Sequence, residues 1–181
     1  MPWMTVANAL TALRALLLAP TVLSVLGGHW GAALALFVGA LATDVLDGWV
    51  ARRRQQVTLL GQLLDPAVDK AFAVGVFSAL TAVGRIPLLG LGLFVLPQLG
   101  LAVGTLVLWR RRGEFVAEWP GKVAAALTAL AAGLLLLTPH GIWAFWVAVG
   151  GQFIAGVYYL VRRTIARTPV GAPLRTRPVR R

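Results

Sequence analysis

Six apolar stretches dominate this sequence, and each is close to the length that an α-helix needs to cross a bilayer. The hydrocarbon core is about 30 Å thick, which takes about 20 helical residues. The predicted spans are residues 5–26, 30–51, 61–83, 86–109, 120–137 and 142–161. The connections between them are short, so consecutive helices should pack antiparallel. We therefore predict an all-α integral membrane protein with six transmembrane helices.

Composition supports a membrane protein and argues against a nucleic-acid-binding one. Of 181 residues, 59% are hydrophobic and 13% are charged, whereas soluble domains have roughly a quarter charged residues. Mean hydropathy is +0.80 and the formal net charge is +11. Such a basic balance can indicate nucleic-acid binding, but that function needs a polar surface. The absence of cysteine excludes disulfides and thiolate metal ligands.

The basic residues predict the orientation, because cytoplasmic connections carry an excess of Lys and Arg. They gather in three places, which are residues 52–54, 110–122 and 162–181. On the other side stand only Arg85, His29 and His140. Both termini should then be cytoplasmic, in the inner membrane of the cell. Residues 1–163 form the expected membrane domain, and residues 164–181 an expected disordered basic tail rich in Pro and Arg.

Four of the six acidic residues lie within 26 positions, namely Asp44, Asp47, Asp65 and Asp69. An Asp inside a membrane helix costs at least about 2.5 kcal/mol, so four of them indicate function. Spacings of three and four place each pair on one helix face, and the two pairs are expected to face each other from antiparallel neighbours. Both pairs fall on the cytoplasmic side.

Four neighbouring carboxylates need cations to stay ionised. An all-oxygen donor set suits hard divalent ions, Mg²⁺ first, with Mn²⁺ or Ca²⁺ as alternatives. The spacing alone leaves open a protonated or Arg-paired network, such as the proton relay of a small cation or proton transporter. A transport path would carry polar residues across the whole membrane, whereas here the ionisable residues stop at the cytoplasmic side.

The acidic residues belong to a longer pattern. It consists of Asp44, two residues, Asp47-Gly48, two residues, Ala51-Arg52, eight residues, Gly61, three residues, Asp65, three residues and Asp69. This resembles the complete signature of the CDP-alcohol phosphotransferase family of membrane enzymes. The resemblance implies a six-helix homodimer that moves a substituted phosphoryl group from a CDP-linked donor to an alcohol and releases CMP.

The same resemblance implies roles for individual residues. The four Asp would hold two divalent ions, and Asp69 would also act as the general base. The CDP donor site would comprise Asn8, Thr11, Gly48, Ala51, Arg52, Thr58 and Gly61.

The acceptor alcohol is predicted from shorter segments. Residues 64–70 and 8–14, with Gly121-Lys122, resemble the branch that contains phosphatidylglycerophosphate and cardiolipin synthases. The expected donor is CDP-diacylglycerol and the expected acceptor glycerol-3-phosphate, with Arg110, Lys122 and Arg162 as candidate acceptor contacts. Pro97-Gln98 stands where many members that use glycerol-3-phosphate carry Arg-Glu, which leaves phosphatidylglycerol or another alcohol as the alternative.

Overall fold

The computed structural model describes the backbone of residues 6–54, 59–110 and 119–166, and the side chains of residues 9–43, 46, 67–100 and 119–161. These ranges are all-helical apart from short turns. The helices are α1 (Val6–Leu26), α2 (Trp30–Arg54), α3 (Leu59–Ala82), α4 (Leu88–Arg110), α5 (Trp119–Leu137), the short 3₁₀ helix η1 (Pro139–Gly141) and α6 (Ile142–Ala166). Each α-helix coincides with one predicted span. The largest difference is at α6, which continues to Ala166 and so enters the expected tail.

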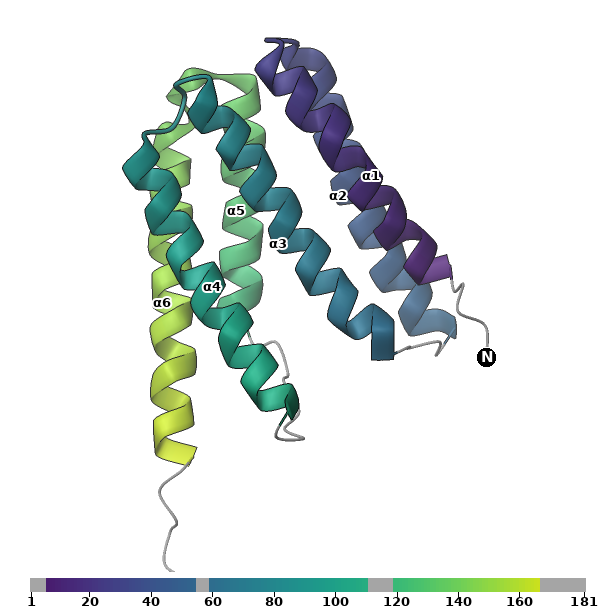
Figure 1. The fold of residues 1–181 in the computed structure, drawn as a ribbon, viewed down its shortest axis with the longest axis vertical. Coiled ribbons are helices and arrows are strands. Elements are labelled where there is room, and N and C mark those ends of the chain that lie inside the picture. Colours follow the sequence, from purple (N-terminus) through teal and green to yellow (C-terminus); the bar gives the residue numbers. More distant parts are fainter. Residues whose placement is uncertain (1–5, 55–58, 111–118, 167–181) are drawn as a thin grey trace, which may run out of the picture.

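The six α-helices form three consecutive antiparallel hairpins, α1–α2, α3–α4 and α5–α6 (Figure 1). α1 packs along both α2 and α3, and α5 packs along α6 and also contacts α2 and α3. α4 lies against α3 and α6. The three hairpin turns are at the upper end of Figure 1, and α1 begins at the lower end. We keep the terms upper and lower end for the two ends of the bundle.

Two glycines make the sharp turns that end α1 and α3. Gly28 and Gly84 have φ of 72° and 79°, a region that costs other residues energy. After α3 the N–H of Arg85 donates to the carbonyl of Leu80 at 2.9 Å, and that of Gly84 to Thr81 at 3.0 Å. This is the Schellman arrangement, in which a left-handed residue closes the last helical turn. Gly28 ends α1 in the same way, with the N–H of His29 donating to the Ser24 carbonyl at 2.8 Å, so two of the three upper turns depend on a glycine.

Aromatic side chains fill the core between the helices. Phe77 of α3 packs edge-on against Phe94 of α4 and Phe145 of α6, with ring centroids 4.7 and 5.2 Å apart. Phe37 of α2 and Phe72 of α3 lie 6.2 Å apart. All five rings are buried. Because lipid is as apolar as these side chains, close packing rather than water exclusion holds the helices together.

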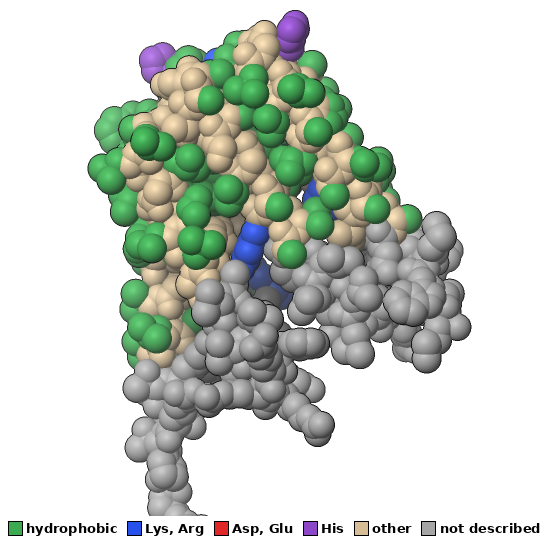
Figure 2. Space-filling model, viewed as in Figure 1, with side chains coloured by type: hydrophobic (Ala, Val, Ile, Leu, Met, Phe, Trp, Pro, Cys, Tyr) green, Lys and Arg blue, Asp and Glu red, His purple; other side chains and the backbone are tan. Residues whose placement is uncertain are grey.

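The outer surface is apolar, as expected for a chain in lipid. Figure 2 shows hydrophobic side chains over the visible described surface, and the two histidines at the upper end. Trp119 and Trp143 are 79% and 77% exposed at the starts of α5 and α6, which lie at opposite ends. The 19 residues of α5 span about 28 Å at 1.5 Å per residue. The two indoles are thus spaced as interfacial anchors are.

Three stretches of the described residues are long and apolar enough to cross a membrane, Ala9–Leu26, Trp119–Leu137 and Pro139–Val161. Shorter apolar helical stretches are Trp30–Thr43 and Leu88–Gly100. A membrane protein of six α-helices is thus supported, and the passage of all six through the bilayer stays a prediction.

Candidate functional site

The structure places the four aspartate positions at two matched depths in the bundle. Asp44 comes ten residues before the end of α2, and Asp69 ten residues after the start of α3. Both are therefore about 15 Å from the lower ends of their helices. Asp47 and Asp65 are closer to those ends, at about 10 Å. The signature thus occupies the lower part of two antiparallel helices, although the side chains of Asp44, Asp47 and Asp65 lie outside the described residues.

Asp69 makes an ion pair with Arg14. Nη1 of Arg14 donates to Oδ1 of Asp69 across 55 residues of sequence. The Arg14 side chain is only 3% exposed, whereas that of Asp69 is 46% exposed. The buried guanidinium of Arg14 on α1 therefore pairs with the exposed carboxylate of Asp69 on α3.

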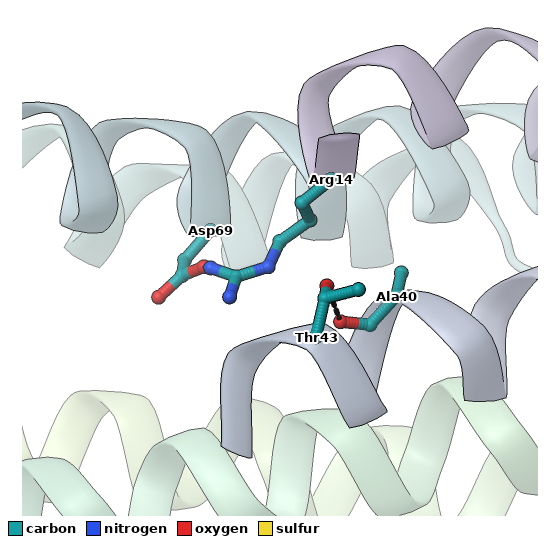
Figure 3. A network of polar contacts seen from close by, with 4 residues as sticks. All are labelled: Arg14, Ala40, Thr43 and Asp69. Carbon is teal, nitrogen blue, oxygen red and sulfur yellow. Dashed lines mark hydrogen bonds and ion pairs between the residues drawn. The ribbon is translucent and has the colours of Figure 1, made fainter. Parts of the chain in front are cut away.

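Figure 3 shows the Arg14 side chain extending from α1 to Asp69 on α3, with Thr43 of α2 nearby. Thr43 is buried, and its hydroxyl donates to the Ala40 carbonyl at 2.7 Å within α2. Thr43 therefore places a buried polar side chain beside the guanidinium. Three helices thus meet around the guanidinium, and Asp44 is the next residue of α2 after Thr43.

Sequence reasoning did not assign Arg14 to the site. A signal was present, because an arginine in the middle of an apolar helix is costly unless a partner neutralises it. The four aspartates were the natural source of that partner. The spacing of the aspartates could not identify which of them pairs with Arg14, since α1 and α3 are separated by the whole of α2 in sequence. Asp69 is thus Arg-paired, as one of the open alternatives allowed.

The expected donor-site residues fall on the lower parts of three helices. Thr11 is buried on α1, one turn before Arg14. Asn8 lies in the first turn of α1, Gly48, Ala51 and Arg52 in the lower part of α2, and Gly61 in the first turn of α3, all with side-chain surroundings outside the described residues. Thr58 lies outside the described backbone as well. The helices thus bring these positions to the end that carries the aspartates.

The candidate acceptor contacts also lie at the lower end. Lys122 is exposed in the first turn of α5. Arg110 is the last residue of α4 and Arg162 is near the end of α6, with side chains outside the described residues. Gln98 is buried on α4, further inside the bundle. Cationic positions therefore surround the lower end from helices α4, α5 and α6.

The donor set fits a divalent cation in its chemistry. Four carboxylates supply hard oxygen ligands, which Mg²⁺ and Mn²⁺ prefer. Their positions occur at matched depths on two antiparallel helices. Asp69 is the member whose side chain the structure describes, and Arg14 already offsets part of its charge.

Comparison with known proteins connects this site to one enzyme family. The sequence profile of the CDP-alcohol phosphatidyltransferase family matches residues 4–154, which include all four aspartates and Arg14. Members of this family are generally divalent-metal dependent, and their substrates are CDP-diacylglycerol and an alcohol acceptor in a membrane setting.

Three relatives illustrate the likeness. A Mycobacterium tuberculosis (strain ATCC 25618 / H37Rv) protein named probable phosphatidylglycerophosphate synthase is 34% identical over 169 residues, covering 86% of this chain and 80% of its own length. The CDP-diacylglycerol–glycerol-3-phosphate 3-phosphatidyltransferase of Pseudomonas fluorescens is 34% identical over 162 residues, covering 83% of this chain and 81% of its own length. The cardiolipin synthase (CMP-forming) of Streptomyces coelicolor is also 34% identical over 162 residues, covering 81% of this chain and 75% of its own length.

Proposed function

Because this chain belongs to the CDP-alcohol phosphatidyltransferase family, we propose that it transfers the phosphatidyl group of CDP-diacylglycerol to glycerol-3-phosphate and releases CMP. In this reaction an acceptor hydroxyl oxygen bonds to the phosphatidyl phosphorus, and the bond from that phosphorus to CMP breaks. The choice of glycerol-3-phosphate as acceptor rests on two relatives that match this chain over about four-fifths of their own length. One is named as a phosphatidylglycerophosphate synthase and the other as a glycerol-3-phosphate 3-phosphatidyltransferase.

The four aspartates would hold two Mg²⁺ ions, with Mn²⁺ as a substitute. Bound ions would neutralise the pyrophosphate and polarise the phosphorus under attack. Asp69 would take the proton of the acceptor hydroxyl, and its exposure of 46% leaves it accessible to that group. Metal coordination lowers the basicity of a carboxylate, so Asp69 depends on close placement of the hydroxyl.

The remaining signature residues would bind the donor. Gly48 and Ala51 have small side chains that leave room beside α2, and Arg52 would contact a donor phosphate. Asn8, Thr11, Thr58 and Gly61 would complete the donor site. Arg110, Lys122 and Arg162 would contact the phosphate of the acceptor from α4, α5 and α6.

The lower end would face the cytoplasm, with all six helices crossing the inner membrane. The support is the charge distribution, because the Arg-rich connections and the end of α6 are at the lower end. The lipid tails of the donor could then stay in the bilayer while its nucleotide meets water. As the family resemblance implies, the enzyme would act as a homodimer.

The packed interior favours an enzyme over a transporter. Above Asp69 the buried side chains of α3 are all apolar, namely Phe72, Val76, Phe77, Ala79 and Leu80. Aromatic rings of three neighbouring helices pack against Phe72 and Phe77. An ion path would need polar groups or water in this region. Substrates would therefore reach the acidic site from the lower end of the bundle.

Cardiolipin synthesis is the second candidate, with phosphatidylglycerol as acceptor. It is favoured by the likeness to the Streptomyces coelicolor enzyme and by Pro97-Gln98 on α4. A neutral Gln98 offers less attraction to an anionic acceptor phosphate than an arginine would.

The test incubates the purified protein in lipid nanodiscs with CDP-diacylglycerol, Mg²⁺ and one acceptor at a time. The acceptors are glycerol-3-phosphate, phosphatidylglycerol, inositol phosphate and serine, and both CMP and the lipid product are measured. We expect CMP release and phosphatidylglycerophosphate with glycerol-3-phosphate. Cardiolipin formed from phosphatidylglycerol would assign the second candidate, and no CMP with any acceptor would overturn the proposed acceptors.

A further inference from the structure

The ion pair between Arg14 and Asp69 joins two residues with very different freedom. Arg14 is nearly fully buried where α1, α2 and α3 meet, so packing fixes its position (Figure 3). Asp69 is about half exposed on α3, and a carboxylate in that setting can rotate among several rotamers. The ion pair with the buried Arg14 therefore restricts the rotamers of the Asp69 side chain.

The chemistry of arginine suits this task. A guanidinium is planar, permanently charged and rigid, so it sets the direction of the carboxylate that it binds. Among its contacts is the hydrogen bond that its Nη1 donates to Oδ1 of Asp69. A charge-assisted hydrogen bond of this kind is roughly twice as strong as a neutral one.

We infer that Arg14 is a positioning residue, which orients the Asp69 carboxylate for the attacking hydroxyl and places a fixed positive charge within the aspartate cluster. This inference rests on the proposed function. It assigns to α1 a part in the reaction that the signature on α2 and α3 does not contain. Arg14 acts through Asp69 and is not itself required to touch the substrate.

The inference has an uncommon consequence. A permanent cation beside the cluster repels divalent ions and competes with them for Asp69. Removing the cation should therefore strengthen metal binding while it slows the reaction, because Asp69 loses its orientation. A residue that only supports folding would weaken both.

The experiment compares Arg14→Gln with Arg14→Lys in nanodiscs. Mn²⁺ affinity is measured by electron paramagnetic resonance without substrate, and CMP release is measured at saturating Mn²⁺. For Arg14→Gln we expect Mn²⁺ affinity to rise about tenfold and kcat to fall about a hundredfold. Arg14→Lys keeps the positive charge but lacks the planar guanidinium, so its Mn²⁺ affinity should stay within about threefold of wild type. Its kcat should lie between those of wild type and Arg14→Gln.

The matched control is Arg85→Gln, which removes a half-buried arginine from the upper end. It should leave Mn²⁺ affinity unchanged. Unchanged affinity and kcat in Arg14→Gln, or a parallel decrease of both, would overturn the inference. If Arg14→Gln does not fold, Arg14→Lys decides, and wild-type kcat in that variant would overturn the positioning role.

The wild-type protein separates this inference from the proposed function. Wild-type protein that neither binds Mn²⁺ nor releases CMP contradicts the proposed function itself. Wild-type protein that does both, with variants that match it, contradicts only the role of Arg14.

Discussion

The guanidinium of Arg85 stacks on the indole of Trp30, with Cζ 3.4 Å from the ring centroid. The same group donates to the carbonyl of Leu135 and, at 3.4 Å, to that of Leu136. These carbonyls belong to the last turn of α5, where helix carbonyls have no intrahelical partner and carry partial negative charge. Arg85 therefore joins the α3–α4 turn to the first residue of α2 and the end of α5.

Loss of this junction should destabilise the bundle without changing its chemistry. Burial lowers the pKa of the Arg85 guanidinium, which still stays charged at neutral pH because arginine starts so high. Arg85→Met should reduce the free energy of unfolding by about 3 kcal/mol, from the lost cation–π contact and charged hydrogen bonds. Unfolding in mixed micelles, followed by tryptophan fluorescence, measures the change.

The control for this prediction is Arg85→Lys, which should recover only part of the stability because an ammonium cannot stack and bind two carbonyls at once. CMP release at a temperature where both variants are folded should stay within about twofold of wild type. Equal stability of Arg85→Met and wild type would show that the contacts contribute nothing.

Gly141 should not tolerate even a methyl group. A Cβ there would lie 2.6 Å from the carbonyl carbon of Leu134 and 2.7 Å from the backbone nitrogen of Leu135. Backbone atoms in a helix cannot move aside as a flexible side chain can, so Gly141→Ala should cost about 3 kcal/mol. Thermal unfolding of the protein in detergent measures the loss. At Gly150 on α6 a Cβ would meet nothing within 4 Å, and Gly150→Ala should be neutral or slightly stabilising.

A buried polar pair links α5 to α6. Gln152 Nε2 donates to Thr128 Oγ1 at 3.0 Å, and that hydroxyl donates to the Ala124 carbonyl at 2.8 Å. Hydrogen bonds between membrane helices contribute about 0.6 kcal/mol on average. A double-mutant cycle of Thr128→Val and Gln152→Leu should give a coupling free energy of about 1 kcal/mol. Strictly additive effects of the two substitutions would contradict the contact.

Asp69→Asn should slow CMP release at least about a hundredfold, since the amide cannot accept the hydroxyl proton. It should also reduce stability by about 2 kcal/mol, because it removes the negative charge of Asp69 from its ion pair with the buried Arg14. The double variant Arg14→Gln/Asp69→Asn should regain stability but not activity. Chelation of wild-type protein with EDTA should abolish activity, and Mg²⁺ or Mn²⁺ should restore it. Activity of Asp69→Asn at the wild-type rate would exclude Asp69 as the base.

Local sequence was sufficient for the helices and for the depth of the aspartates. Helix bounds follow hydropathy closely because a segment in lipid must satisfy its backbone polar groups within itself. The structure adds that Gly28 and Gly84 make two of the upper turns, where the left-handed conformation favours glycine. The spacing of Asp44 to Asp69 then determined how far each position lies from the helix ends.

The partners of the charged side chains were decided by tertiary structure alone. Trp30 stood near a predicted helix end and Arg85 in a connection, and neither position indicated that they stack. Arg14 and Asp69 are 55 residues apart, and Arg85 and Leu135 are 50 apart. Hydropathy is nearly uniform around these helices, so the sequence carries little information about which faces meet. Only the packing of α1 against α3, and of α5 near the α3–α4 turn, brings each cation to its partner.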